Sequence, residues 1–545
     1  MNYFDLVATN ISEKKLSSAE IENGLTIAAQ SIAGCIGTSQ QTERTSVLLD
    51  RFVYNDTDRR SDKVTSIALG ILKTLGREIK HSEDIATRRT LDGLLDIAEQ
   101  AHGRAVASTD KILNVNLDNY AGLVCEEALT CIANAMLLRP ECKQGFSDAH
   151  GFDVIARILD SKSLSPTVDF LCGRCLFLSL VGSSGSVERL VSHLKLQTGL
   201  AKKVQLYLDQ NAETLISVSR FSPQQVMAEL LKASMNLCVG FQRGVGASKS
   251  TSDDSIPPEH ASDFAQLLGV SLDTIRSLPV PTAGHLAEAS KQAFSIALNF
   301  STLRPESIKS IWLPDTGDRW ANVDSIYTIF DRLVRFAVGS KYTKGSTDTA
   351  DTADKYQVEL TPVALVLVRL MAEHVDVRQR ILDRVYPQAH KSEHSKLPED
   401  RSGISGKLVR LLRIPQGGML PGAIGDFLLT LLSQDVKQFV MATGYGNAAG
   451  YLLARGIDIP ADVLKDVGSG LAEQLPVDPV TGRAFDQAEI DRELAAMSNE
   501  EKEREAERLF VLLERLNKTG VIKVQNPIHA AWESGRFHEL SSDEE

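Results

Sequence analysis

The chain has 545 residues, of which 24% are charged and 6% aromatic, and its formal net charge is −12. This composition is typical of a folded globular protein and excludes a largely disordered chain. The acidic balance argues against nucleic acid as a partner, because a basic face supplies most of the affinity for a phosphate backbone.

The first residues, MNYFDLVATNISEKK, lack the charged and then apolar layout of a secretory signal. Apolar runs such as ALVLV at 364–368 are too short to span a bilayer. We therefore expect a cytoplasmic protein without membrane insertion. The pair Cys172 and Cys175 forms a lone CxxC in an apolar segment, and no second pair completes a zinc site. This predicts buried, reduced thiols, and we expect neither a metal nor a cofactor.

Helical periodicity dominates the chain. Apolar residues recur every three or four positions in the segments 64–76, 122–138, 226–241, 289–301, 362–374 and 423–440. Several of these segments are apolar nearly all round, so each must be covered on both sides. Because no β-strand set or βαβ alternation stands beside them, the sequence predicts an all-α fold.

Three of these helices share a pattern that ends in an asparagine: Asn134, Asn236 and Asn299, which are 102 and 63 residues apart. Irregular repeats with two or three helices each are typical of a right-handed superhelical solenoid of the armadillo/HEAT type. Polar stretches at 244–258, 339–355 and 387–403 are predicted to be loops.

We expect the solenoid to cover residues 1–456. A connector over 457–497 leads to a detached amphipathic helix over 498–522, and an acidic flexible tail covers 523–545. Ser498 and Glu501 have the spacing of a capping box at the start of this helix. Its apolar stripe consists of Leu509, Leu512, Leu513 and Leu516, with Phe510 beside it.

The glycine-rich stretch MATGYGNAAGYLLARG, residues 441–456, raises the question of a nucleotide site. Its spacing is GxGxxxG, a helix precedes it instead of a strand, and no Lys-Ser/Thr pair follows. We expect a turn instead, in which Gly444 caps one helix in a left-handed conformation and Asn447 caps the next helix from Ala448.

The sequence of this turn nevertheless resembles that of the synembryn family, also known as resistance to inhibitors of cholinesterase proteins. The resemblance covers GKLVRLL at 406–412 followed by TGYGNAAGYLLARG at 443–456, DPVTGR at 478–483, and EEKEREAERLFVLLERLNKTGVI at 500–522. The three boxes occur in the family's order across the last third of the chain. The first two thirds match more loosely, through segments such as EALTCIANA.

The resemblance implies a monomeric non-receptor exchange factor and folding chaperone for heterotrimeric G-protein α subunits (Gα), in their GDP-bound, nucleotide-free or nascent state. It further implies that the groove of the solenoid captures the C-terminal helix of Gα, and that Gα recruits the protein to the cell cortex. It assigns Gα binding in the groove to Lys73, Arg77, Arg378 and Arg380, and the late helix to a second Gα contact. Asparagines on the inner helices can pair with the peptide units of a bound chain, which makes Asn134, Asn236 and Asn299 candidates as well. Asn134 ranks first among them, because its segment resembles the one with which the family contacts the peptide.

Lys73 and Arg77 are spaced i,i+4, which predicts one shared helix face. The plain alternatives stay open: asparagines that bridge neighbouring repeats, basic residues that are solvated surface charges, and a late helix that folds back on the solenoid. Ser541 and Ser542 precede acids by three positions and are possible phosphorylation sites, although an unmodified acidic tail is the simpler interpretation.

Two other classes of function are the alternatives to this interpretation. A generic armadillo scaffold or transport adaptor would bind another extended peptide, and acidic side chains in the groove would then favour a basic ligand. An enzyme with covalent chemistry is not supported, because the chain has no HExxH, nucleophile elbow or kinase motif set.

Overall fold

A computed structural model describes residues 2–459 except 10–15, 56–60, 110–119, 163–164, 182–186, 210–219, 247–260, 279–284, 301–305, 340–347, 388–395 and 415–418, and also residues 497, 498, 501, 502, 504 and 508. The described residues form helices and no strand, which confirms the all-α prediction. They divide into two compact units, one of residues 1–385 and 410–434, the other of residues 386–409 and 435–545.

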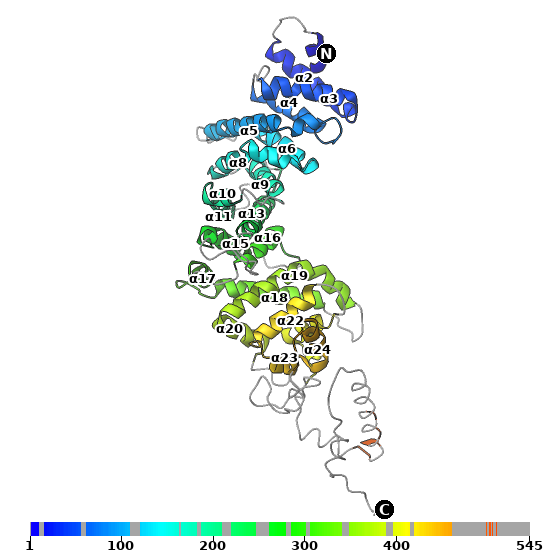
Figure 1. Ribbon diagram of the computed structural model, residues 1–545, viewed down its shortest axis with the longest axis vertical. Coiled ribbons are helices and arrows are strands. Elements are labelled where there is room, and N and C mark those ends of the chain that lie inside the picture. The colour runs from blue at the N-terminus through cyan, green and yellow to red at the C-terminus, as the bar shows by residue number, and fades with distance from the viewer. Residues whose placement is uncertain are drawn as a thin grey trace, which may run out of the picture. The chain divides into compact units, whose positions relative to one another are not determined.

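The first unit contains a row of helices that each contact the next member along the chain (Figure 1). We call this the first row; it consists of α2 (Ser18–Ser31), α4 (Asp62–Leu75), α6 (Tyr120–Leu138), α9 (Pro166–Leu180), α13 (Pro223–Gly246), α16 (Glu288–Asn299), α19 (Asp348–Glu373) and α22 (Met419–Leu431). Such nearest-neighbour contacts are typical of stacked-helix proteins.

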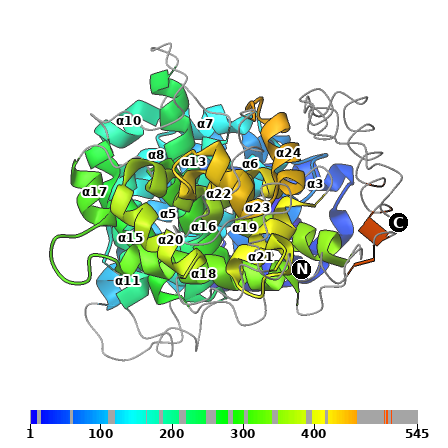
Figure 2. The ribbon, with the colours of Figure 1, turned by 90° about the horizontal axis from the view of Figure 1, so that it is seen from below.

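A second row covers one side of the first. It consists of α5 (Arg88–Thr109), α8 (Gly151–Asp160), α11 (Leu196–Asp209), α15 (Ala265–Ser277), α18 (Ala321–Val338) and α20 (Val375–Val385). Its members contact first-row helices, as in the pairs α5 with α6, α11 with α13 and α18 with α19. Seen along the stack, α8, α11 and α15 lie to the left of α6, α13 and α16 (Figure 2). Apolar side chains from both rows fill the core between them.

Shorter helices complete this unit. They are α1 (Tyr3–Thr9), η1 (Ile32–Cys35), α3 (Ser39–Leu48), the π-helix η2 (Leu49–Tyr54), η3 (Glu83–Ala86), α7 (Cys142–Asp148), α10 (Val187–Ser192), η4 (Ser262–Phe264) and α17 (Glu306–Trp312). The predicted loop over 339–355 is too long, because α19 already begins at Asp348.

The second unit contains the 3-10 helix η6 (Pro398–Asp400), α23 (Val436–Thr443) and α24 (Tyr445–Ala454), while α21 (Ile404–Leu412) crosses the boundary between the units. Gly444 has a φ of 83° and its amide donates to Val440 at 2.7 Å, so the predicted positive-φ glycine at this turn is confirmed. The cap predicted at Asn447 is wrong. α24 begins three residues earlier than expected, and Asn447 donates back to the Thr443 carbonyl at 2.6 Å.

Two features of the described helices bear on the sequence analysis. All seven cysteines are buried and form no disulfide, as predicted for Cys172 and Cys175. α6 has the length and apolar character of a membrane-crossing helix, but it packs against α4, α5 and α9 and buries ten residues there. It is therefore a core helix of the stack.

Candidate functional site

An open pocket of about 200 Å³ lies where α4, α6 and α9 follow one another in the first row. Arg220 and Phe221, just before α13, complete its wall. The side chains that line it are Lys73, Glu126, Glu127, Thr130, Ala133, Asn134, Leu137, Thr167, Phe170, Leu171, Arg174, Leu178, Arg220 and Phe221. The pocket thus combines apolar, aromatic, cationic and acidic groups from segments that are far apart in the sequence.

The acidic side of the pocket consists of two adjacent glutamates on α6. Lys73 of α4 reaches across to Glu127 with an Nζ–Oε2 distance of 2.6 Å, and both side chains are mostly buried. Burial, reinforced by the neighbouring charge of Glu127, raises the pKa of Glu126 to about 7. Lys73 therefore neutralises one carboxylate, while the other takes up a proton near neutral pH.

The opposite wall is aromatic and cationic. The rings of Phe170 and Phe221 stack with centroids 3.8 Å apart and an interplanar angle of 9°. The guanidinium of Arg174 lies over Phe170 at 5.4 Å, and that of Arg220 lies over Phe221 at 5.5 Å. A cation held on a ring face keeps its outer edge available to an anion. This applies to Arg220, which forms no ion pair with a described residue, whereas Arg174 is paired with Glu229.

Asn134 lines this pocket from α6 and is half-buried. Among the described residues its side-chain amide has no hydrogen-bond partner. An amide carries two N–H donors and an acceptor oxygen, the same groups that a peptide backbone offers. Asn134 is thus placed to pair with a bound chain.

The other two asparagines of the repeated pattern are occupied within the protein. Asn236 Nδ2 donates to the Phe177 carbonyl at 3.1 Å, so it links α13 to α9. Asn299 Nδ2 donates to the Ser295 carbonyl at 2.8 Å, and its Oδ1 accepts from Gln242 at 3.0 Å. Both side chains make the bridge between neighbouring helices that was the alternative interpretation, and a role for them in partner binding stays a prediction.

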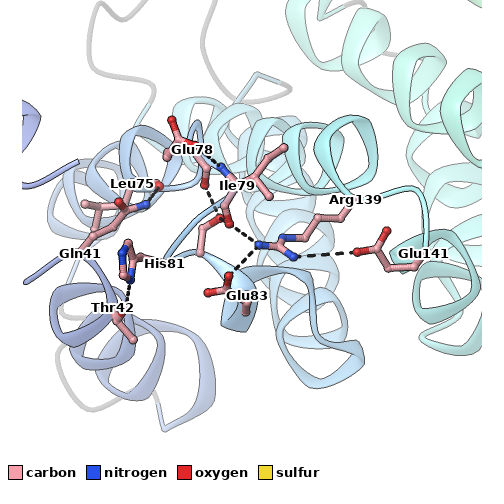
Figure 3. A network of polar contacts seen from close by, with 10 residues as sticks. Gln41, Thr42, Leu75, Glu78, Ile79, His81, Glu83, Arg139 and Glu141 are labelled. Carbon is pink, nitrogen blue, oxygen red and sulfur yellow. Dashed lines mark hydrogen bonds and ion pairs between the residues drawn. The ribbon is translucent and has the colours of Figure 1, made fainter. Parts of the chain in front are cut away.

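Lys73 and Arg77 do not share a helix face, and this expectation is wrong. α4 ends at Leu75, and the Gly76 amide donates to Leu72 at 2.9 Å to close its last turn. Arg77 lies in the following turn, where it is exposed. Polar contacts from both sides hold this turn, among them those of Gln41 and Arg139 (Figure 3).

The later basic pair lies on α20, outside the pocket lining. Arg380 forms a two-pronged contact with Asp324 of α18 at 2.8 and 2.7 Å, and Arg384 reaches the same carboxylate at 2.8 Å. The hydrogen bonds from Arg380 hold the pKa of Asp324 below its usual value. Arg378 donates to the Met371 carbonyl at 3.2 Å. The contacts of Arg380 and Arg384 join α20 to α18, and that of Arg378 joins α20 to α19, so these arginines stabilise the packing of α20.

A line of ion pairs continues from the pocket along the first row. Arg174 of α9 contacts Glu229 of α13 at 2.8 Å. Lys232 lies 3.5 Å from Glu288 of α16, and Lys291 lies 3.0 Å from Glu359 of α19. The surface of these helices therefore carries both signs of charge, and an all-acidic groove of the kind that suits a basic signal is not present there.

Sequence reasoning missed Arg174, Arg220, Phe170 and Phe221 in the pocket. A signal for Arg174 was available, since it is the one cation in the apolar segment DFLCGRCLFLSLV at 169–181. The aromatic pair gave none, because it forms only when α9 meets the start of α13. The described residues hold no group of three or more His, Cys, Asp or Glu side chains that could bind a metal ion.

The late helix is described only at its start. Ser498 Oγ accepts from the Glu501 amide at 3.3 Å, and the Glu501 carboxylate accepts from the Ser498 amide at 3.0 Å, which confirms the capping box. The predicted contact residues Leu509, Phe510, Leu512, Leu513 and Leu516, and the serines Ser541 and Ser542, lie outside the described residues.

These observations place the chain in the class of stacked-helix proteins, with an open pocket of mixed charge on the first row. A family model described as guanine nucleotide exchange factor synembryn (Ric8) matches residues 68–536. The chain belongs to this family, as the sequence motifs predicted.

Individual relatives agree with this assignment. Chaperone Ric-8A of Gallus gallus is 22% identical over 511 residues, which cover 87% of this chain and 88% of that protein. A synembryn-like chaperone of Schizosaccharomyces pombe is 32% identical over 208 residues, or 35% of this chain and 38% of the relative. Chaperone ric-8 of Caenorhabditis elegans is 29% identical over 170 residues, 30% of each chain.

Proposed function

We propose that this protein is a guanine nucleotide exchange factor and folding chaperone for heterotrimeric G-protein α subunits. It binds GDP-bound or nascent Gα, promotes release of GDP and stays bound to the nucleotide-free form. Membership of the synembryn family and the chaperone names of its relatives support this function. The reaction makes and breaks no covalent bond.

The mechanism is a shift of population in the partner. The first row receives the C-terminal helix of Gα, and withdrawal of that helix from its own domain loosens the guanine site. A protein that weakens GDP binding through such coupling must itself be released by nucleotide to a matching degree. GTP binding to the emptied Gα therefore ends the cycle, and the exchange factor supplies only its preference for one conformation.

The observation that carries this proposal is the half-buried amide of Asn134, which lines the pocket and has no hydrogen-bond partner among the described residues. It would pair with the main chain of the Gα tail. Arg220 on the stacked rings forms no ion pair with a described residue and suits a carboxylate group of that tail. Arg174 and Lys73 lie in the same pocket but are paired with Glu229 and Glu127, so they would have to exchange these partners for the tail. Arg77 is exposed in the turn that follows α4, and it would reach the terminal carboxylate.

The remaining assignments belong to the same proposal. The stack is an armadillo/HEAT superhelix that extends to residue 456, and after the connector the helix over 498–522 makes a second contact with Gα through its apolar stripe. Asn236, Asn299, Arg378 and Arg380 are secondary candidates for groove contacts, because each is engaged within the protein. The protein works as a cytoplasmic monomer that Gα brings to the cell cortex.

The decisive experiment mixes the purified protein with Gα loaded with a fluorescent GDP analogue and follows nucleotide release. We expect faster release than from Gα alone, and no acceleration with Gα that lacks its last residues. Unchanged release from intact Gα, together with no gain in its folded yield, would contradict the proposed function. Acceleration that survives the truncation would contradict the groove mechanism but not the exchange activity.

A further inference from the structure

The loop over residues 76–83 leads from the end of α4 into the first residue of η3 (Figure 3). It begins directly after the last turn of α4, which carries the pocket residue Lys73. It presents Arg77, Ile79 and Lys80 to the outside, and the side chain of Ile79 is 49% exposed. Exposed loops of this length usually adapt to their surroundings.

This loop, however, is fixed from both sides. On the α3 side, Gln41 Nε2 donates to the Leu75 carbonyl at 2.7 Å, and Thr42 Oγ1 lies 3.2 Å from His81 Nδ1. His81 itself has a φ of 66°, a conformation that non-glycine residues adopt only when their surroundings impose it. The loop is therefore held in one shape at a cost in backbone energy.

Arg139 supplies the restraint from the other side. It follows the last turn of α6, two residues after the pocket residue Leu137. Its Nη2 donates to the Ile79 carbonyl. The same Nη2 donates to the Glu83 carboxylate at 3.1 Å, and Nη1 lies 3.9 Å from the Glu141 carboxylate. Figure 3 shows the guanidinium reaching from α6 between these groups. Only 15% of the Arg139 side chain is exposed, so it is well packed for a surface arginine.

Arg77 contrasts with Arg139. Its guanidinium forms no ion pair with any described residue, although it lies two positions before the carbonyl that Arg139 holds. A planar arginine that donates to a main-chain carbonyl and a carboxylate at once orders the main chain around it. The main chain near Arg77 is thus held by Arg139, whose guanidinium donates to the Ile79 carbonyl of the same loop.

We infer that Arg139 is a positioning residue for partner binding: it locks loop 76–83 so that Arg77 is presented, already ordered, to the terminal carboxylate of the bound Gα tail. The inference rests on the proposed function and adds a residue to it. An ordered loop binds more tightly because less conformational freedom is lost on association. Lysine could not replace Arg139 fully, since one ammonium lacks the fork that spans these acceptors.

The test is a double-mutant cycle on the full chain with GDP-loaded Gα as the probe. We expect Arg77→Ala to weaken binding about tenfold, the size of one charge-assisted contact. Arg139→Ala should weaken it about fivefold, and Arg139→Lys should fall between Arg139→Ala and the wild type. The double variant should bind no more than about twofold more weakly than Arg77→Ala, because Arg139 acts through Arg77.

Arg104→Ala is the matched control, since it breaks an exposed ion pair with Asp62 at 2.7 Å on the same unit. It should bind like the wild type. Gα that lacks its last residues should not distinguish Arg77→Ala or Arg139→Ala from the wild-type chain. Thermal unfolding verifies that each variant is folded.

Two outcomes would overturn the inference alone while wild-type binding stands. One is an Arg139→Ala variant that binds as tightly as wild type. The other is a double variant whose loss equals the product of the two single losses, which would indicate general damage instead of positioning. A wild-type chain that fails to bind Gα would overturn the proposed function, and this inference with it.

Discussion

Lys203 and Asp169 form an ion pair that water does not reach, with Nζ 3.4 Å from Oδ1 and both side chains at most 1% exposed. The pair joins α11 of the second row to α9 of the first. Lys203 also donates to the Ser161 carbonyl at 2.7 Å, and Asp169 accepts from the Tyr207 hydroxyl at 2.6 Å. The charges are thus compensated by a complete polar network in the core.

Replacing one partner should therefore be costly. We expect Lys203→Met to lower the free energy of unfolding by about 3–5 kcal/mol, because Asp169 is left as an uncompensated buried charge. The double variant Lys203→Met with Asp169→Leu should recover most of this loss. Urea unfolding followed by circular dichroism measures both, and a single variant as stable as the wild type would contradict the prediction.

Gly173 marks the closest approach between two first-row helices. A Cβ at this position of α9 would lie 3.2 Å from main-chain atoms of Glu229 and Leu230 in α13. Gly173→Ala should push the helices apart and cost about 1–3 kcal/mol of stability. Gly269 in α15 has open space around it, so Gly269→Ala should instead stabilise by about 0.5–1 kcal/mol. Equal effects of the two substitutions on the urea midpoint would refute this packing argument.

Asn134 and Asn236 should respond in opposite ways to alanine. Asn134→Ala should weaken Gα binding about five- to tenfold and leave stability unchanged, since the amide has no internal partner among the described residues. Asn236→Ala removes its bond to the Phe177 carbonyl and should cost about 1 kcal/mol of stability with little change in affinity. Titration calorimetry with Gα and thermal unfolding, run on both variants, separate the two outcomes.

The raised pKa of Glu126 predicts a pH dependence of stability. Its value of about 7 exceeds the ordinary 4.5, so between these values the folded state holds a proton that the unfolded chain has released. The free energy of unfolding should therefore fall as pH rises through this window, by at most about 3 kcal/mol, and then level off. Glu126→Gln should abolish this fall.

Glu99→Gln is the control for that titration. A hydrogen bond from Arg157 lowers the pKa of Glu99, so its stabilising contribution is complete above 4.5 and is lost only as pH falls below that value. In Glu99→Gln, unfolding midpoints measured between pH 4.5 and pH 7 should therefore still fall as the pH rises, as they do in the wild type. A decline that also persists in Glu126→Gln would assign it to another group.

Removal of residues 498–522 tests the late helix. We expect the truncated chain to lose only the helical signal of the removed segment and to keep its unfolding midpoint, while exchange activity and Gα affinity fall. The expected contact is made by the stripe of leucines with Phe510, and burying such side chains contributes about 1.5–3 kcal/mol each. Circular dichroism and nucleotide-release kinetics provide the two readings. Full affinity after truncation would show that the helix makes no such contact.

The sequence foretold what depends on local pattern. Helical periodicity, the capping box of Ser498 and Glu501, and the positive φ of Gly444 each need only a few neighbouring residues. The prediction from sequence was wrong where it depended on the exact end of a helix. Because α4 ends at Leu75, Arg77 does not lie on the helix face that it was expected to share with Lys73. The aromatic wall of Phe170 and Phe221 depends on contact between α9 and the start of α13, which periodicity does not encode.

The buried thiols have a practical consequence. All seven cysteines are inside the protein, and burial raises the pKa of Cys142 to about 11 and that of Cys175 to about 12. Thiolate, the reactive form, is thus scarce at neutral pH at these two positions, and burial shields all seven sulfur atoms from reagents. A single cysteine introduced on the surface, for example at position 137 in place of Leu137, would therefore react with a maleimide dye while the native cysteines stay unlabelled. The native protein is ready for fluorescence reporting without prior removal of its own cysteines.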